Sequence, residues 1–131
     1  MSHWEQHDLT TVVGAILQSA RFDANHHFGR PYLSSYQVAI EIEHRFPDIF
    51  EAIGKPTGGV GSGHTSLAQY VANELSKKIK AEGVSFPVEG VFMAHDHVRA
   101  MTFARSNGEL IESSLVDGGI PMSMFRWRDG S

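Results

Sequence analysis

Two histidines lie two residues apart in the segment His95-Asp96-His97. Because side chains alternate along a β-strand, both imidazoles would point to the same face if this segment is extended. Two imidazoles on one face can be two ligands of a zinc or iron ion, with His26, His27 or His64 as the third. His95 and His97 therefore make a divalent metal a candidate cofactor. The alternative is an exposed segment just before a hairpin.

A glycine-rich segment offers a second kind of chemistry. Residues 58–65 read G-x-x-x-x-G-H-T, the pattern of a phosphate loop with histidine where that motif has lysine. Backbone N–H groups at a helix N-terminus favour anions, so an anion-binding loop is predicted at Gly61, Gly63, His64 and Thr65. Without the lysine and a preceding strand, nucleotide hydrolysis is not expected. A bound nucleic-acid phosphate and a plain connector remain as alternatives.

No arrangement of nucleophile and base stands out. The chain contains neither a G-x-S-x-G nor an H-E-x-x-H sequence, and it has no cysteine. Neighbouring carboxylates such as Glu41 and Glu43 point in different directions on a helix. Apart from the histidine pair, the sequence therefore argues against an enzyme.

The most informative positions lie on a helix expected to begin at Thr65 or Ser66 and to end at Gly83. Its apolar stripe, from Leu67 to Ile79, is the face expected to be buried. The opposite face carries polar side chains and no acid: Ser66, Gln69, Tyr70, Asn73 and Lys77. Amides can read adenine edges, while hydroxyls and lysine reach phosphates. This face is a candidate nucleic-acid contact, and an ordinary solvated helix face is the alternative.

Two earlier helices are expected from local signals. Asp8 is predicted to cap the first of them, ahead of an amphipathic stripe. Ser34 or Ser35 is predicted to cap the second, which a proline at position 47 ends. Asp48 is predicted to cap a further short turn that ends at Gly54.

The pattern changes to β after residue 87. A short strand is expected at 91–93, followed by a hairpin that turns at Asn107-Gly108, because a type I′ turn needs positive φ at both central positions. A two-residue turn would place Ala104 opposite Ile111 on a small apolar face that packs on helices. Residues 123–128 alternate like a final strand.

Together these elements predict an α+β fold, with a three-helix winged-helix-like core followed by a β-hairpin and a short antiparallel sheet. One domain is expected over residues 1–131, helical over about 8–82 and β over about 88–128. Over residues 33–116 the order of elements resembles the winged helix-turn-helix architecture. The resemblance implies that the third helix enters the major groove of duplex DNA and that Arg99 and Arg105 contact phosphates. The long connection before that helix and the acidic helices before it count against this interpretation.

Composition sets further bounds. The chain has a net charge of −4 and eight histidines. This charge counts against non-specific nucleic-acid binding by the whole surface, but it does not exclude a local basic patch. The start of the chain lacks a secretory signal, and no apolar run is long enough to span a membrane, so a cytoplasmic protein without membrane contact is expected.

The sequence therefore predicts a small winged-helix-like DNA-binding protein, such as a transcription regulator or an accessory factor. The alternative is a protein-interaction subunit or inhibitor, hetero-complexed or homodimeric, that acts through its acidic face and through the tail at residues 121–131. Methionine, aromatic and arginine residues occur together in this tail, as they do in interface cores. The tail can equally be a core strand with Phe125 and Trp127 pointing inward.

Overall fold

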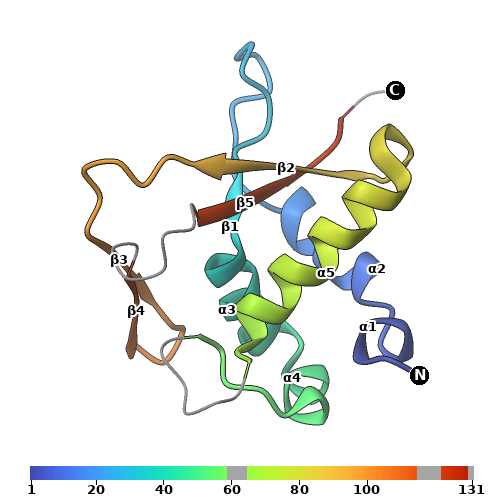
Figure 1. Cartoon of the computed structure of the whole chain (residues 1–131), viewed down its shortest axis with the longest axis vertical. Helices are drawn as coiled ribbons and strands as arrows, with labels where there is room; N and C mark the ends of the chain where they lie inside the picture. Colours follow the sequence, from blue (N-terminus) through green and yellow to red (C-terminus); the bar gives the residue numbers. More distant parts are fainter. Residues whose placement is uncertain (59–64, 115–121, 130–131) are drawn as a thin grey trace.

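The structure is a computed structural model that describes residues 1–58, 65–114 and 122–129 (Figure 1). In these ranges the helical elements are α1 (His3–Gln6), α2 (Leu9–Gln18), α3 (Ser35–Arg45), α4 (Pro47–Ile53), α5 (Leu67–Glu82) and the 3-10 helix η1 (Gly83–Ser85). The strands are β1 (Leu33–Ser34), β2 (Val88–Met93), β3 (Ala100–Ala104), β4 (Leu110–Ser114) and β5 (Met122–Trp127). They form two small antiparallel sheets, and the predicted α+β class is confirmed.

Local capping signals explain where the main helices begin and end. Ser34 caps α3 in a capping box, in which its hydroxyl accepts the Gln37 N–H and the Gln37 side chain accepts the Ser34 N–H. Ser66 caps α5 by accepting the Gln69 N–H. Glycines at positions 54 and 83 end α4 and α5 with positive φ, as the sequence predicted.

One cap prediction is confirmed in position only, and another is wrong. Asp8 is the N-cap residue of α2, but its carboxylate accepts the Thr11 hydroxyl instead of a backbone N–H, and its backbone is left-handed with a φ of 48°. Helix α4 already begins at Pro47, which fits the first helical position, so Asp48 lies inside the first turn. The four-residue helix α1 was not predicted, because so short an element shows no hydrophobic period.

The larger sheet has the order β1-β5-β2, so the C-terminal strand β5 is its centre. Phe125 of β5 is buried and lies opposite Leu33 on one side and Gly90 on the other. Trp127 is half-buried and packs against Gly14 of α2, where a Cβ would come within 2.7 Å of the indole ring. The tail is therefore a core strand of the fold.

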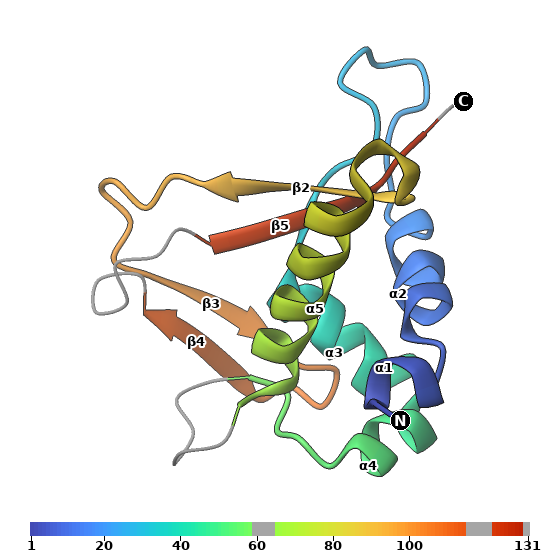
Figure 2. The ribbon, with the colours of Figure 1, turned by 45° about the vertical axis from the view of Figure 1, so that its right-hand side comes forward.

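Helix α5 contacts both helix α3 and the larger sheet. Its first part packs on α3, and Ile79 near its end lies against Gly90 of β2. Figure 2 shows α5 between the β3–β4 hairpin on one side and α1 and α2 on the other. The buried core joins these elements through the following residues: Leu9, Val13, Ile16, Leu17, Val38, Ile42, Leu67, Val71, Leu75, Val88 and Phe125. None of the helices in the described ranges is long and apolar enough to cross a membrane.

The predicted hairpin exists, but its register is shifted by one residue. Ala104 lies opposite Leu110 instead of Ile111, which faces Phe103. Within the turn only Gly108 has a positive φ, of 92°, and its N–H donates to the carbonyl of Arg105. This geometry is a three-residue loop with a glycine bulge, whereas the prediction assumed a two-residue turn.

The shift in register reverses the predicted orientation of the β3 side chains but leaves Ile111 of β4 pointing inward, because a slip of one residue changes the face of one strand only. Phe103 stacks on Tyr36 of α3 with ring centroids 5.3 Å apart, and Ile111 is buried beside it. Ala104, predicted to point inward, is exposed. The hairpin therefore packs on α3 through its large apolar side chains.

Candidate nucleic-acid interface

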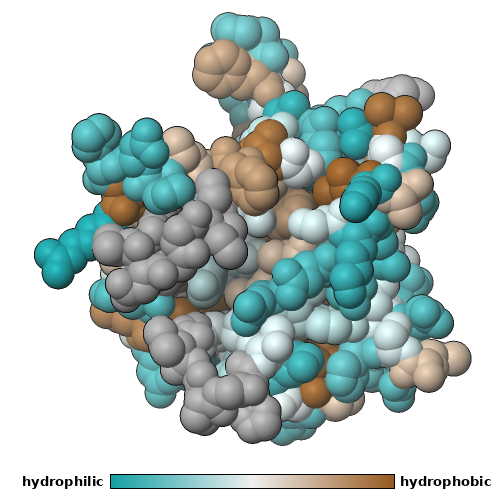
Figure 3. All heavy atoms as spheres, in the orientation of Figure 1, coloured by the Kyte–Doolittle hydropathy of each residue, from teal (hydrophilic) through white to brown (hydrophobic). Residues whose placement is uncertain are grey.

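The outer face of α5 carries an unbroken row of exposed polar side chains. Gln69, Asn73 and Lys77 are exposed as the sequence predicted. Ser76 and Lys80 extend the row, and their positions three residues after Asn73 and Lys77 could have revealed them. Figure 3 shows hydrophilic side chains running along this helix. We call these five residues the α5 strip.

The α5 strip contains no acid. At 100° per residue, Glu74 lies to one side of it and Glu82 lies on the far side. Within the described ranges no carboxylate pairs with Lys77 or Lys80. Both ammonium groups are therefore available to a polyanion.

Two residues predicted for this face do not lie on it. Ser66 is buried, and its hydroxyl is committed to the helix cap. Tyr70 is partly covered by α1: its hydroxyl oxygen accepts the Trp4 N–H at 3.1 Å, and its ring meets the edge of His3. Burial raises the pKa of the Tyr70 hydroxyl, so the group stays protonated. The prediction failed here because α1 itself was not foreseen.

The two arginines predicted on the hairpin have different surroundings. Arg105 donates to both carboxylate oxygens of Glu43 on α3 and also pairs with Glu109. The hydrogen bonds from Arg105 hold the pKa of Glu43 below its ordinary value, and Glu43 in turn raises the pKa of Arg105. Arg105 is thus occupied in docking the hairpin onto α3. Arg99 precedes β3, is exposed and makes no ion pair with the described residues.

The histidine pair does not share one face of a strand, so that prediction is wrong. Strand β2 ends at Met93, and the following residues form a turn in which the Val98 N–H donates to the His95 carbonyl. His97 adopts a positive φ of 65° in this turn. Among the described residues no three His, Asp or Glu side chains come close enough to hold a metal ion.

The predicted anion-binding loop can be followed in part. Gly61, Gly63 and His64 lie outside the described residues, and Thr65 is exposed just before the Ser66 cap. The first N–H groups of α5 are already satisfied. Those of residues 67 and 68 donate to the carbonyls of residues 56 and 57, and that of residue 69 donates to the Ser66 hydroxyl. The N–H groups of residues 67–69 are therefore not free to bind an anion.

An apolar groove runs beside the α5 strip. It has a volume of about 240 Å³ and lies between Ile79 of α5 and the inner residues of β2 and β5. On the edge strand β2, Val91 and Phe92 expose 44% and 66% of their surface. Nothing in the sequence singled out this pair, because a short apolar run looks the same in a buried strand and in an exposed one.

Comparisons of the chain with models of known protein families, with curated proteins and with solved structures found no match.

Proposed function

We propose that this protein binds duplex nucleic acid, with α5 as the element that enters the major groove. The observation that carries the proposal is the α5 strip, which is exposed, free of acid and borne on a 16-residue helix. Gln69 and Asn73 would read base edges, because side-chain amides bond adenine in a bidentate way. Lys77 and Lys80 would contact phosphates.

The order of the elements supports this assignment. A helix, a short strand and further helices are followed by the four strands β2 to β5, and the short strand β1 pairs with the last strand β5. Without the β3–β4 hairpin this order resembles that of a winged-helix domain, in which α5 would be the recognition helix. The connection between β2 and β5 then takes the place of the wing, and Arg99 lies on it. The hairpin at Asn107-Gly108 is an addition within this connection.

The charge distribution is compatible with such a role despite the net charge of −4. Three carboxylates are paired with three arginines, and these pairs leave the net charge unchanged. Glu43 and Glu109 pair with Arg105, and Glu89 pairs with Arg126 and Arg128. The lysines of the α5 strip have no such partner in the described ranges, so they form a local cationic surface.

The test compares a preferred duplex with an unrelated one. A duplex is selected from a random pool with the parent protein, and binding is measured by fluorescence anisotropy. Gln69→Ala and Asn73→Ala should each weaken binding to the selected duplex by about 1–3 kcal/mol and should leave binding to the unrelated duplex nearly unchanged. Gln18→Ala, which removes an exposed amide at the end of α2, is the control. Equal affinity of the parent for all duplexes, or no binding at low salt, contradicts the proposal.

Exposure of Val91 and Phe92 on an edge strand favours a second candidate, a protein-interaction domain. The predicted interaction through the tail is not its basis, because deleting residues 121–131 would remove the central strand. Phe92→Ser is the appropriate variant. Two results together would favour this candidate over nucleic acid. Light scattering would show a stable homodimer or hetero-complex of the parent that the variant no longer forms, and the parent would show no salt-dependent binding to a duplex.

A further inference from the structure

A second cleft lies between the segment 21–32 and Arg126 of β5. Its volume is about 530 Å³, which is within the range of small-molecule sites. It is lined by aromatic and cationic side chains, among them Phe22, His26, Phe28 and Tyr32 with Arg21, Arg30 and Arg126. Asp23 is its one carboxylate lining residue. Arg30 and Arg126 are paired with Asp129 and Glu89, so Arg21 is the lining cation that has no carboxylate partner among the described residues.

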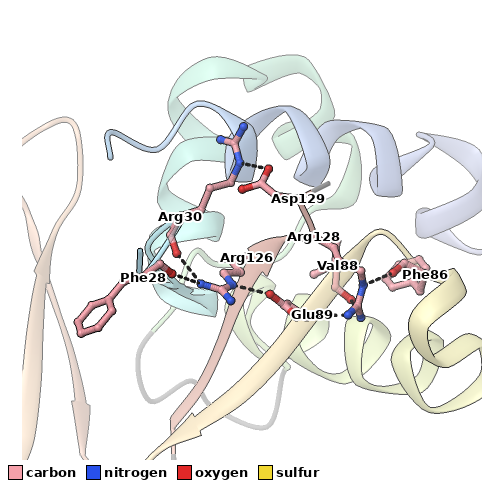
Figure 4. A network of polar contacts seen from close by, with 8 residues as sticks. All are labelled: Phe28, Arg30, Phe86, Val88, Glu89, Arg126, Arg128 and Asp129. Atoms are coloured by element: carbon pink, nitrogen blue, oxygen red, sulfur yellow. Dashed lines mark hydrogen bonds and ion pairs between the residues drawn. The ribbon is translucent and has the colours of Figure 1, made fainter. Parts of the chain in front are cut away.

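The segment that forms the cleft is tied to the sheet. One terminal nitrogen of Arg126 donates to the carbonyls of Phe28 and Arg30, both at 3.0 Å, while its Nε binds Glu89. Figure 4 shows this guanidinium between the loop carbonyls and Glu89. The loop turns at Gly29, whose φ of 78° is a backbone conformation that residues with a side chain rarely adopt. Main-chain bonds to a β5 residue thus fix the shape of the loop.

Two arginine–aromatic stacks form the walls. The Arg30 guanidinium lies 4.6 Å from the ring centroid of Phe22, and its nitrogens donate to Asp129 and to the Gln18 carbonyl. The Arg126 guanidinium lies 4.5 Å from the ring centroid of Tyr32. Because these cations are held by several bonds, the walls are ordered before any ligand arrives.

Other groups in this region are left over for a ligand. The rings of His26 and His27 stack at 4.5 Å, and both meet Phe28 edge-on. Phe28 nevertheless exposes 73% of its surface. The Arg21 side chain is exposed, and it makes no hydrogen bond or ion pair with the described residues. An exposed aromatic cluster and an unpaired guanidinium therefore occur at one cleft.

We propose that this cleft binds a nucleotide, either as a free molecule or as one unit of a single strand. The base would stack on Phe28 and the neighbouring histidines, because aromatic rings bind every base face. The phosphate would pair with Arg21, since a guanidinium fork matches phosphate oxygens. A nucleotide supplies both a planar ring and an anion, which matches the two kinds of side chain the cleft leaves unused. The site is separate from the α5 strip.

The direct test is titration calorimetry of the full chain with AMP, adenosine and inorganic phosphate. AMP should bind with a dissociation constant below about 1 mM, and adenosine and phosphate should each bind more weakly. Phe28→Ala should weaken AMP binding at least about fivefold, which is the lower end for loss of one stacking partner. The hydrogen bond that holds the loop on β5 survives this substitution, because Arg126 donates to the backbone carbonyl of residue 28. Arg21→Gln should weaken AMP binding but leave adenosine binding unchanged.

Leu110→Ala is the control, because it removes an equally exposed apolar side chain, on the β3–β4 hairpin. Circular dichroism checks that every variant is folded. A single-stranded tetranucleotide distinguishes the two sources: tighter binding than AMP indicates a strand, and equal or weaker binding indicates a free nucleotide. The proposal is overturned if neither AMP nor the tetranucleotide binds, if Phe28→Ala has no more effect than the control, or if phosphotyrosine binds more tightly than AMP.

Discussion

Binding of duplex DNA should depend on salt to a degree set by three cations, two on the α5 strip and one before β3. Lys77, Lys80 and Arg99 are exposed and unpaired within the described ranges. Each phosphate contact contributes about 0.9 to the slope of log affinity against log salt, so three contacts give a slope of about −2.7. Affinity should then fall about 40-fold between about 50 and 200 mM salt. In the double variant Lys77→Gln/Lys80→Gln one contact remains, and the fall should be only about 3.5-fold.

The assay is fluorescence anisotropy with a labelled duplex over a series of salt concentrations. Lys78→Gln provides a matched control on the same helix, because Lys78 is turned toward α1, with its ammonium group 5.6 Å from the ring centroid of Trp4. The control should keep the slope of the parent. A parent slope near zero would refute the reasoning, and so would a double variant that keeps the parent slope or a control that loses as much as the double variant.

Three predictions concern stability, each measured by chemical denaturation. Glu43→Gln should lower the free energy of unfolding by about 1 kcal/mol at neutral pH. Because Arg105 lowers the pKa of Glu43, the stability difference between parent and variant is complete above the ordinary pKa of 4.5 and disappears as the pH falls through the lowered pKa. A difference that does not change with pH would contradict this prediction. Gly14→Ala should be destabilising by about 1 kcal/mol, because the clash with Trp127 outweighs the helix propensity gained; a stabilised variant would show that the indole moves aside. Gly108→Ala should cost about 1 kcal/mol through its positive φ, and an unchanged midpoint would argue against the bulged turn.

The helical half of the fold was largely predictable because its signals are local. A cap and its partner lie three residues apart, as in Ser34 with Gln37, and a terminating glycine acts on its own backbone. The apolar stripe of α5 likewise predicted its buried face. Within that helix the prediction failed at Tyr70, whose cover comes from Trp4, 66 residues away in the sequence.

The hairpin shows which features the local sequence predicts and which depend on tertiary contacts. Asn107-Gly108 predicted that the chain reverses there, but the same residues allow two loop lengths that differ by one position. Contacts of Phe103 with Tyr36 and of Arg105 with Glu43 are made only in the observed register. Both partners lie on α3, more than 60 residues earlier in the sequence, so no local pattern contains them.

The sequence by itself determined the α+β class, the ends of its main helices, the existence of the hairpin and the polar face of α5, because each follows from neighbours within about one turn or one strand. The tertiary structure alone decided which polar residues remain exposed, that Arg105 binds carboxylates, and that the tail is the central strand. It also brought the segment 21–32 against β5 to form the aromatic and cationic cleft. Such contacts join residues about 100 positions apart, and their geometry is fixed only when the whole core packs.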